Sequence, residues 1–185
     1  MTKTRDEALA LLREWVKNEN LVKHMLCVEA AMRAYAKKFG GDEELWGTTG
    51  LLHDFDYERF PTKDGHPFEG NKVLKELGYP EELLRAILSH ADYSGVTREN
   101  QMEKALYACD ELCGFVVAAA LVRPDKLNGM TASSVNKKLK DKHFAAAVSR
   151  DDIDRGVAQL GVDRNEHIET VIIAIQSITA ELGLA

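Results

Sequence analysis

The chain has 185 residues, of which 45% are hydrophobic and 29% charged, a balance typical of one folded domain spanning residues 1–185. Its formal net charge of −6 disfavours nonspecific binding to nucleic acid and to anionic membranes. The three cysteines, Cys27, Cys109 and Cys113, form no disulfide framework and lie in apolar helical stretches, so we expect free core thiols and a reducing, cytoplasmic compartment.

Helical periodicity runs through the chain, and no alternating strand pattern is convincing. We therefore predict an all-α fold with helices at 5–17, 20–39, 42–54, 67–77, 80–91, 101–122, 133–143, 151–160 and 164–182. Gly40-Gly41 and Gly78 indicate helix ends, whereas Pro80 and Thr131 to Ser134 indicate helix starts. The charged N-terminus lacks a secretory signal, and no apolar run approaches the roughly 20 residues that span a bilayer, so we expect no membrane association.

Several polar residues fall on apolar helix faces. His24 and His90 share stripes with aliphatic residues, and His53-Asp54 ends the apolar run of LLHDFDYE (51–58). An inward histidine is usually a satisfied core residue. Asp110 is harder to explain, because an ionised carboxylate is costly to bury and its stripe holds no lysine or arginine. A bound metal would resolve that burial.

Taken together, His24, the adjacent His53-Asp54 pair and Asp110 resemble the HD superfamily of metal-dependent phosphohydrolases. The resemblance covers about residues 20–122 and leaves about 131–185 as an additional C-terminal helical extension. It implies an all-helical HD bundle in which these four residues bind a divalent metal.

A second segment extends the resemblance. GHPFEGNKVLKELG (65–78) is similar to the H-P-x-x-G segment of HD domains with two metals, such as the HD-GYP phosphodiesterases. The similarity implies that His66 and His90 bind a second metal and that Asp54 bridges the two ions. Their second adjacent histidine is replaced here by Ala91, and their Gly-Tyr-Pro motif is absent after Gly95. A cyclic dinucleotide is therefore not supported, and the chain looks more like the small stand-alone bacterial HD hydrolases.

This ligand set implies hydrolysis of a phosphate mono- or diester, nucleotides included, by a metal-bound hydroxide. One divalent ion with Asp54 and Asp110 sums to zero charge, whereas two ions leave a surplus of +2 that suits a phosphate. Imidazole and carboxylate ligands favour one or two ions of Mn, Fe, Co, Ni or Zn. The family's lysine after the HD pair is replaced by residues 55–57, so the general acid stays open, with Asp56, Lys63 and Asp92 as candidates.

The stretch SSVNKKLKDKHF (133–144) is the concentrated basic region of the chain. It is either a solvated helix face, on which Val135, Leu139 and His143 pack, or a clamp for a phosphate or nucleotide tail. The clamp would consist of Arg123, Lys137, Lys138 and Lys142. His143 and His167 match no motif position, and we interpret both as structural or surface residues.

Two alternative functions remain open. Some HD-fold proteins with six such ligands are di-iron oxygenases, and the metal and its open positions decide between the two chemistries. Other HD domains are non-catalytic nucleotide sensors, but those typically lose ligands that are present here. We expect a small phosphorylated substrate, and a homo-oligomer is compatible with the sequence.

Overall fold

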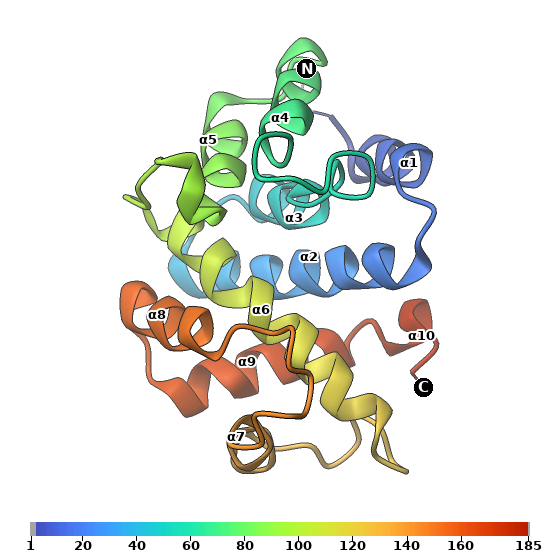
Figure 1. Ribbon diagram of the computed structural model, residues 1–185, viewed down its shortest axis with the longest axis vertical. Helices are drawn as coiled ribbons and strands as arrows, with labels where there is room; N and C mark the ends of the chain where they lie inside the picture. The colour runs from blue at the N-terminus through green and yellow to red at the C-terminus, as the bar shows by residue number, and fades with distance from the viewer. Residues whose placement is uncertain (1–2, 185) are drawn as a thin grey trace.

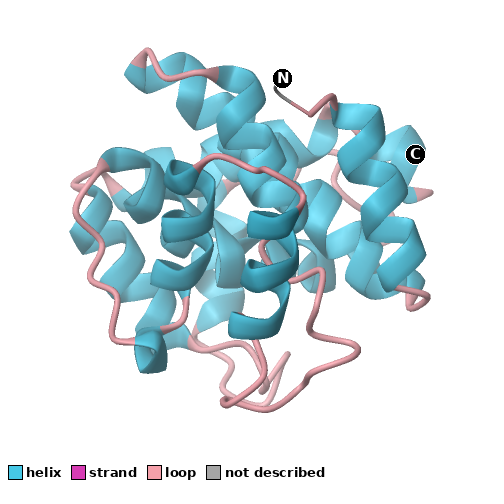
Figure 2. Ribbon diagram, turned by 90° about the horizontal axis from the view of Figure 1, so that it is seen from above, coloured by secondary structure: helices cyan, strands magenta, loops and turns pink. Residues whose placement is uncertain are grey.

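The computed structural model describes residues 3–184, and every regular element in that range is helical (Figure 2). The all-α prediction is confirmed. The elements are α1 (Arg5–Trp15), α2 (Glu19–Phe39), α3 (Glu43–Leu52), α4 (Phe68–Glu76), α5 (Glu81–His90), the 3₁₀ turn η1 (Asp92–Ser94), α6 (Gln101–Leu121), α7 (Ala132–Leu139), α8 (Arg150–Leu160), α9 (Arg164–Gln176) and α10 (Thr179–Leu182). Among these described residues, no helix is both long and apolar enough to cross a membrane.

The helix boundaries follow from local side-chain chemistry. Thr4, Asn100 and Thr131 each form a capping box with the residue three positions later, which satisfies N–H groups of the first turn. Gly40 and Gly78 have φ values of 70° and 80°, a left-handed conformation that glycine adopts without strain. The helix ends predicted at these glycines and the start predicted at Thr131 are confirmed.

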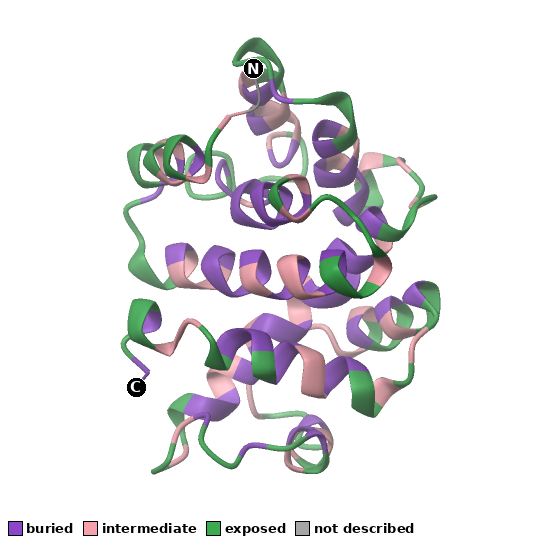
Figure 3. Ribbon diagram, turned by 180° about the vertical axis from the view of Figure 1, so that it is seen from behind, coloured by how far each residue is buried: buried purple, intermediate pink, exposed green. Residues whose placement is uncertain are grey.

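The two long helices α2 and α6 form the centre of the molecule. The α2 helix runs across the middle, with α1, α3, α4 and α5 on one side and α7 to α10 on the other (Figure 1). The α6 helix crosses α2 and also packs against α5, α8 and α9, so it joins the two halves. Buried residues occur along most of α2, as Figure 3 shows, because its neighbours cover it from both sides. Cys27, Cys109 and Cys113 are buried free thiols in this core.

The helix predicted at 133–143 ends earlier, at Leu139. Asp141 turns the chain by accepting hydrogen bonds from two backbone N–H groups just downstream. The Arg150 guanidinium then donates to several carbonyl groups of the following loop, which replaces helical hydrogen bonding. As a result His143, which we expected to pack, is exposed, and Phe144 packs against the core instead.

The helix predicted at 164–182 is divided into α9 and α10. It is interrupted at Ile178, which has φ −119° and ψ 18°, while the Ser177 hydroxyl donates to the carbonyl of Ala174. The break redirects the chain so that Leu182 and Leu184 are buried, at 1% and 8% exposure. Burial of these two leucines outweighs the local helical pattern on which the prediction relied.

His167 is a structural residue at the junction of α2, α6 and α9. Its Nε2 donates to the carbonyl of Ala108 at 3.0 Å, so its Nδ1 must accept from the Tyr35 hydroxyl at 2.5 Å. A neutral imidazole satisfies both contacts, whereas a second ring proton would face the hydroxyl. Burial lowers the pKa of His167 to about 4.

This low pKa predicts a pH-dependent stability. The unfolded chain binds a proton at His167 below about pH 6.5, but the native state does not until about pH 4. The free energy of unfolding should therefore fall as the pH drops through this window, by up to ~1.4 kcal/mol per pH unit from this residue. Urea unfolding of the wild type and of His167→Gln between pH 7.5 and 4.5 measures it. The free energy of unfolding of the wild type should exceed that of His167→Gln by less as the pH falls. A difference that stays constant across this pH range would contradict a neutral, buried His167.

Candidate metal centre

Six side chains converge where α6 crosses α2, beside the ends of α3 and α5. Two come from the faces of long helices, one from the end of α5, two from the end of α3 and one from the loop before α4. They are the residues predicted as metal ligands: His24, His53, Asp54, His66, His90 and Asp110. Because the packing of four helices places them, their arrangement is largely fixed by the fold.

The first group joins α2, α3 and α6. Asp110 Oδ1 lies 3.0 Å from His24 Nε2 and 3.3 Å from His53 Nε2. His24, His53 and Asp54 each offer one atom within 4.8 Å of the others, a spacing at which a single ion can contact all three. This group contains the HD pair itself.

The second group joins α3, α5 and the loop before α4. Asp54 Oδ1 lies 3.2 Å from His66 Nε2 and 3.3 Å from His90 Nε2. These three residues also offer atoms within 4.8 Å of one another. Asp54 therefore belongs to both groups and lies between them.

Backbone and side-chain acceptors fix how the three buried histidines face the centre. His53 Nδ1 donates to the carbonyl of Gly50 at 2.8 Å, and His90 Nδ1 donates to the carbonyl of Ile87 at 2.5 Å. His66 Nδ1 donates to Oδ1 of Asp56 at 2.7 Å. Since each Nδ1 carries the proton, the neutral ring presents an Nε2 lone pair to the centre.

The orientation of these lone pairs fits bound cations. His53 Nε2 is completely buried and has no hydrogen-bond partner among the described residues. His66 Nε2 and His90 Nε2 face each other at 3.2 Å, a repulsive contact for two neutral rings with this tautomer. A cation placed between these nitrogens and Asp54 would satisfy all three groups.

The electrostatics of the site favour positive charge. Burial alone would lower the pKa of His53, but attraction to Asp54 and Asp110 outweighs burial and raises it to about 9. Burial alone would raise the pKa of both carboxylates, yet the surrounding histidines hold both values well below the usual range. The two acids are therefore ionised and favour positive charge at His53 Nε2, which either a proton or a metal ion supplies.

A family comparison agrees with this arrangement. The model of the HD domain matches residues 21–120, which is more than half of the chain. The chain belongs to the HD domain family. HD domains are generally metal-dependent hydrolases and bind divalent metals, so the resemblance to the HD superfamily that the sequence indicated is confirmed. No curated protein and no solved structure matches the chain.

In this HD protein, Asp56 positions a histidine and does not line the cavity at the centre. Its Oδ1 accepts from His66 Nδ1 at 2.7 Å, and its Oδ2 accepts from the backbone N–H of Gly70 at 2.7 Å. The carboxylate is buried, and a Cβ built at Gly70 would lie 2.6 Å from its Cγ. With both oxygens engaged, Asp56 is not placed for the general-acid role for which it was one of three candidates, and it orients His66 instead.

A cavity of about 460 Å³ opens onto the HD centre. Beyond the ligands, its wall carries tyrosines and acids: Tyr57, Asp92, Tyr93, Tyr107, Glu111 and Asp152. None of the described lysines and arginines lines it. Arg155 donates to both Asp92 and Asp152 from outside the wall, while burial and the neighbouring Asp110 raise the pKa of Glu111 to about 7.

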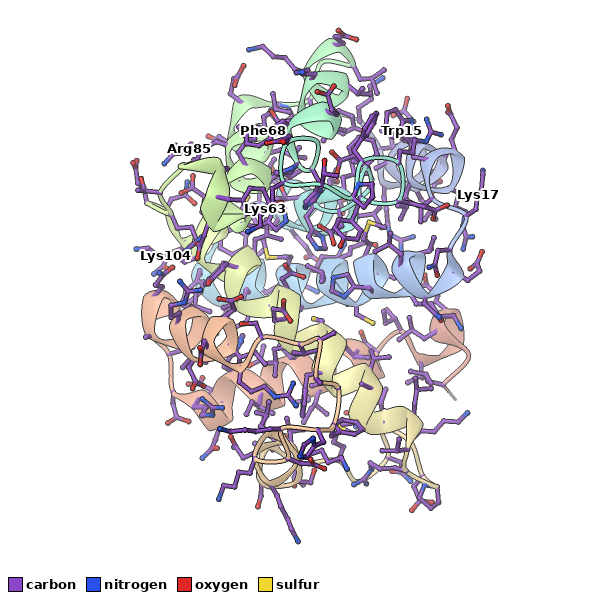
Figure 4. The ribbon with its side chains drawn as sticks, viewed as in Figure 1. Trp15, Lys17, Lys63, Phe68, Arg85 and Lys104 are labelled. Carbon is purple, nitrogen blue, oxygen red and sulfur yellow. The ribbon has the colours of Figure 1, made fainter. Side chains whose placement is uncertain are left out.

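The other general-acid candidates differ in position. Lys63 lies on the loop between α3 and α4, where Figure 4 labels it, with its ammonium 5.6 Å from the centre of the Tyr93 ring. It is exposed and outside the cavity wall. Asp92 does line the cavity, but its two oxygens accept from Arg98 and Arg155. Neither position identifies a proton donor.

The predicted phosphate clamp is not assembled at this cavity. Arg123 donates to the carbonyls of Lys126 and Asn128 just after α6. Lys137 and Lys138 lie on α7, whereas Lys142 follows that helix and lines a different cavity. None of the four contributes to the wall beside the ligands, so we leave them out of the proposed site.

Sequence reasoning missed the residues that support the ligands. The carbonyls of Gly50 and Ile87 carry no side-chain signal, so a sequence pattern cannot reveal them. Gly70 was visible as the last position of H-P-x-x-G, although its contact with Asp56 was not. Tyr107 and Glu111 lie on α6 within four residues of Asp110, and that spacing was the available clue.

The Asp56 contact leads to a prediction. Replacing Asp56 with Asn removes the charge that fixes His66, so metal affinity should fall about 10- to 100-fold, as is usual for such supporting groups. Asp64→Asn is the matched control, because Asp64 is exposed in the same loop. Titration with Mn²⁺ or Co²⁺ by calorimetry, alongside circular dichroism, measures the effect. Equal affinities in both variants would rule out the orienting role.

Proposed function

We propose that this HD protein hydrolyses a phosphate mono- or diester at a centre of two divalent transition metals. The observation that carries the proposal is the position of Asp54, which shares one ligand group with His24 and His53 and another with His66 and His90. Mixed imidazole and carboxylate ligands suit Mn, Fe, Co, Ni or Zn. His24, His53, Asp54 and Asp110 would hold one ion, and Asp54, His66 and His90 the other.

Charge supports two ions over one. Asp54 and Asp110 neutralise a single divalent cation, which leaves little attraction for a phosphate. A second cation brings a surplus of +2 at a cavity whose wall has no lysine or arginine among the described residues. The substrate's negative charge would then be balanced chiefly at the centre.

When bound, such ions lower the pKa of a coordinated water toward ~7 and neutralise charge on the phosphate. The chain's own residues prepare the site. The carbonyls of Gly50 and Ile87 keep the Nδ1 protons of His53 and His90 away from the centre, and Asp56 does the same for His66. Hydrolysis adds a water oxygen to phosphorus and breaks the bond to the organic oxygen, which takes one proton and leaves as an alcohol.

The proposal extends to substrate size and compartment. A cavity of about 460 Å³ accommodates a small phosphorylated compound, nucleotides included. The three buried free thiols are compatible with the reducing cytoplasm that we propose as the location.

Loss of Asp54 should abolish turnover. We expect protein loaded with Mn²⁺, Co²⁺, Fe²⁺ or Zn²⁺ to release the phenol from aryl phosphate mono- or diesters, and Asp54→Ala to release none, because both ligand groups lose their shared carboxylate. Asp64→Ala is the control. Undiminished phenol release by Asp54→Ala would refute the assignment. Oxygen consumption by the iron form without hydrolysis of either ester would favour the oxygenase alternative.

The number of ions can be tested separately. His66→Ala and His90→Ala should each lower metal content from about two ions per chain toward one while largely preserving helix content. His143→Ala is the matched control, because His143 is exposed and outside the cavity. Elemental analysis after desalting gives the stoichiometry. Full metal content in both variants would exclude the second ion.

A further inference from the structure

Gly114 in the second half of α6 has no packing reason to be glycine. A Cβ built at the other helical glycines, Gly47, Gly50, Gly70 and Gly156, would come within 2.9 Å of a neighbouring atom. At Gly114 the nearest atom would be His24 Nδ1, at 3.9 Å. Its φ is not in the left-handed region either. Because glycine lowers helix stability relative to alanine, its presence here needs another explanation.

An apolar groove lies directly beyond Gly114. It has a volume of about 270 Å³ and lies between the start of α2, the second half of α6 and the C-terminal segment. In Figure 1, α10 lies below the N-terminal half of α2 and beside the end of α6. The apolar lining of the groove consists of Val117, Ala118, Leu121, Leu182 and Leu184.

The groove adjoins the HD centre. His24 and Gly114 line both the groove and the cavity that contains the ligands. Asp110, Gly114, Val117 and Leu121 are spaced by three or four residues, so one face of α6 leads from a ligand to the apolar lining. A side chain at Gly114 would project between the two spaces, beside His24.

We propose that this groove holds the apolar organic group of the substrate and that Gly114 keeps the passage to it open. The inference rests on the proposed hydrolysis of a phosphate ester and adds the class of ester. With the phosphate at the ligands, an organic group directed along α6 would meet aliphatic side chains. Asn20 and Lys23 are the polar residues of the groove besides His24, so a flexible alkyl group is better matched than a sugar.

A series of n-alkyl phosphates from methyl to octyl tests the groove. In the wild type, kcat/KM should rise with chain length by up to about fourfold per methylene that enters the groove. Gly114→Val blocks the passage, and Ala118→Leu fills the groove without lying at the ligand cavity. Both should lower the octyl-to-methyl ratio of kcat/KM at least about tenfold, which corresponds to about two lost methylenes. Ala147→Leu, at an exposed position outside both cavities, should keep the wild-type ratio.

Binding of the matching alkylphosphonates separates the two proposals. Phosphonates are not hydrolysed, so calorimetry on metal-loaded protein reports the groove without turnover. If phosphate is released but the wild type shows no preference for longer chains, or both variants keep it, the groove assignment fails and hydrolysis stands. A second outcome is that no ester is hydrolysed, but octylphosphonate binds more tightly than methylphosphonate to the wild type and not to Gly114→Val or Ala118→Leu. The groove assignment then stands and the proposed hydrolysis fails. If neither kcat/KM for the esters nor affinity for the phosphonates increases with alkyl chain length, the inference is overturned.

Discussion

The HD centre depends on one electrostatic constraint: imidazole nitrogens and negative charges are gathered at a cavity that none of the described lysines and arginines lines. Three buried histidines turn their Nε2 atoms inward because their Nδ1 protons are held elsewhere. Asp54 lies among them as an ionised carboxylate. Positive charge at this point relieves the repulsion, and the packing of α2, α3, α5 and α6 brings the opposing groups together.

The loop between α3 and α4 is as important as the helices that flank it. Asp56 connects this loop to the first turn of α4 by accepting from His66 and from the backbone N–H of Gly70. Any larger residue at position 70 would collide with that carboxylate. The histidine and glycine of the H-P-x-x-G segment thus act through one acid that precedes them in the chain, which gives the motif a physical meaning.

Local patterns in the sequence were sufficient for the helical fold, whereas the convergence of the six candidate ligands was expected from the resemblance to the HD superfamily. Apolar periodicity located the long helices, and the charge of Asp110 on a core stripe indicated a cation. The patterns failed where distant contacts decide the outcome. Burial of Leu182 and Leu184 breaks the last helix, and the Arg150 contacts end α7 early. The role of Asp56 was also out of reach, because its partner Gly70 lies fourteen residues away and bonds through its backbone.

The far wall of the apolar groove comes from a part of the chain that supplies no ligand. All six candidate ligands lie within residues 24–110, whereas Leu182 and Leu184 belong to the last turn and its end. Under the proposed assignment, one wall of the groove that selects the organic group is thereby encoded apart from the ligands. If the groove holds the organic group, mutations near the C-terminal segment would diversify the compounds that the protein accepts while the reaction centre is inherited unchanged.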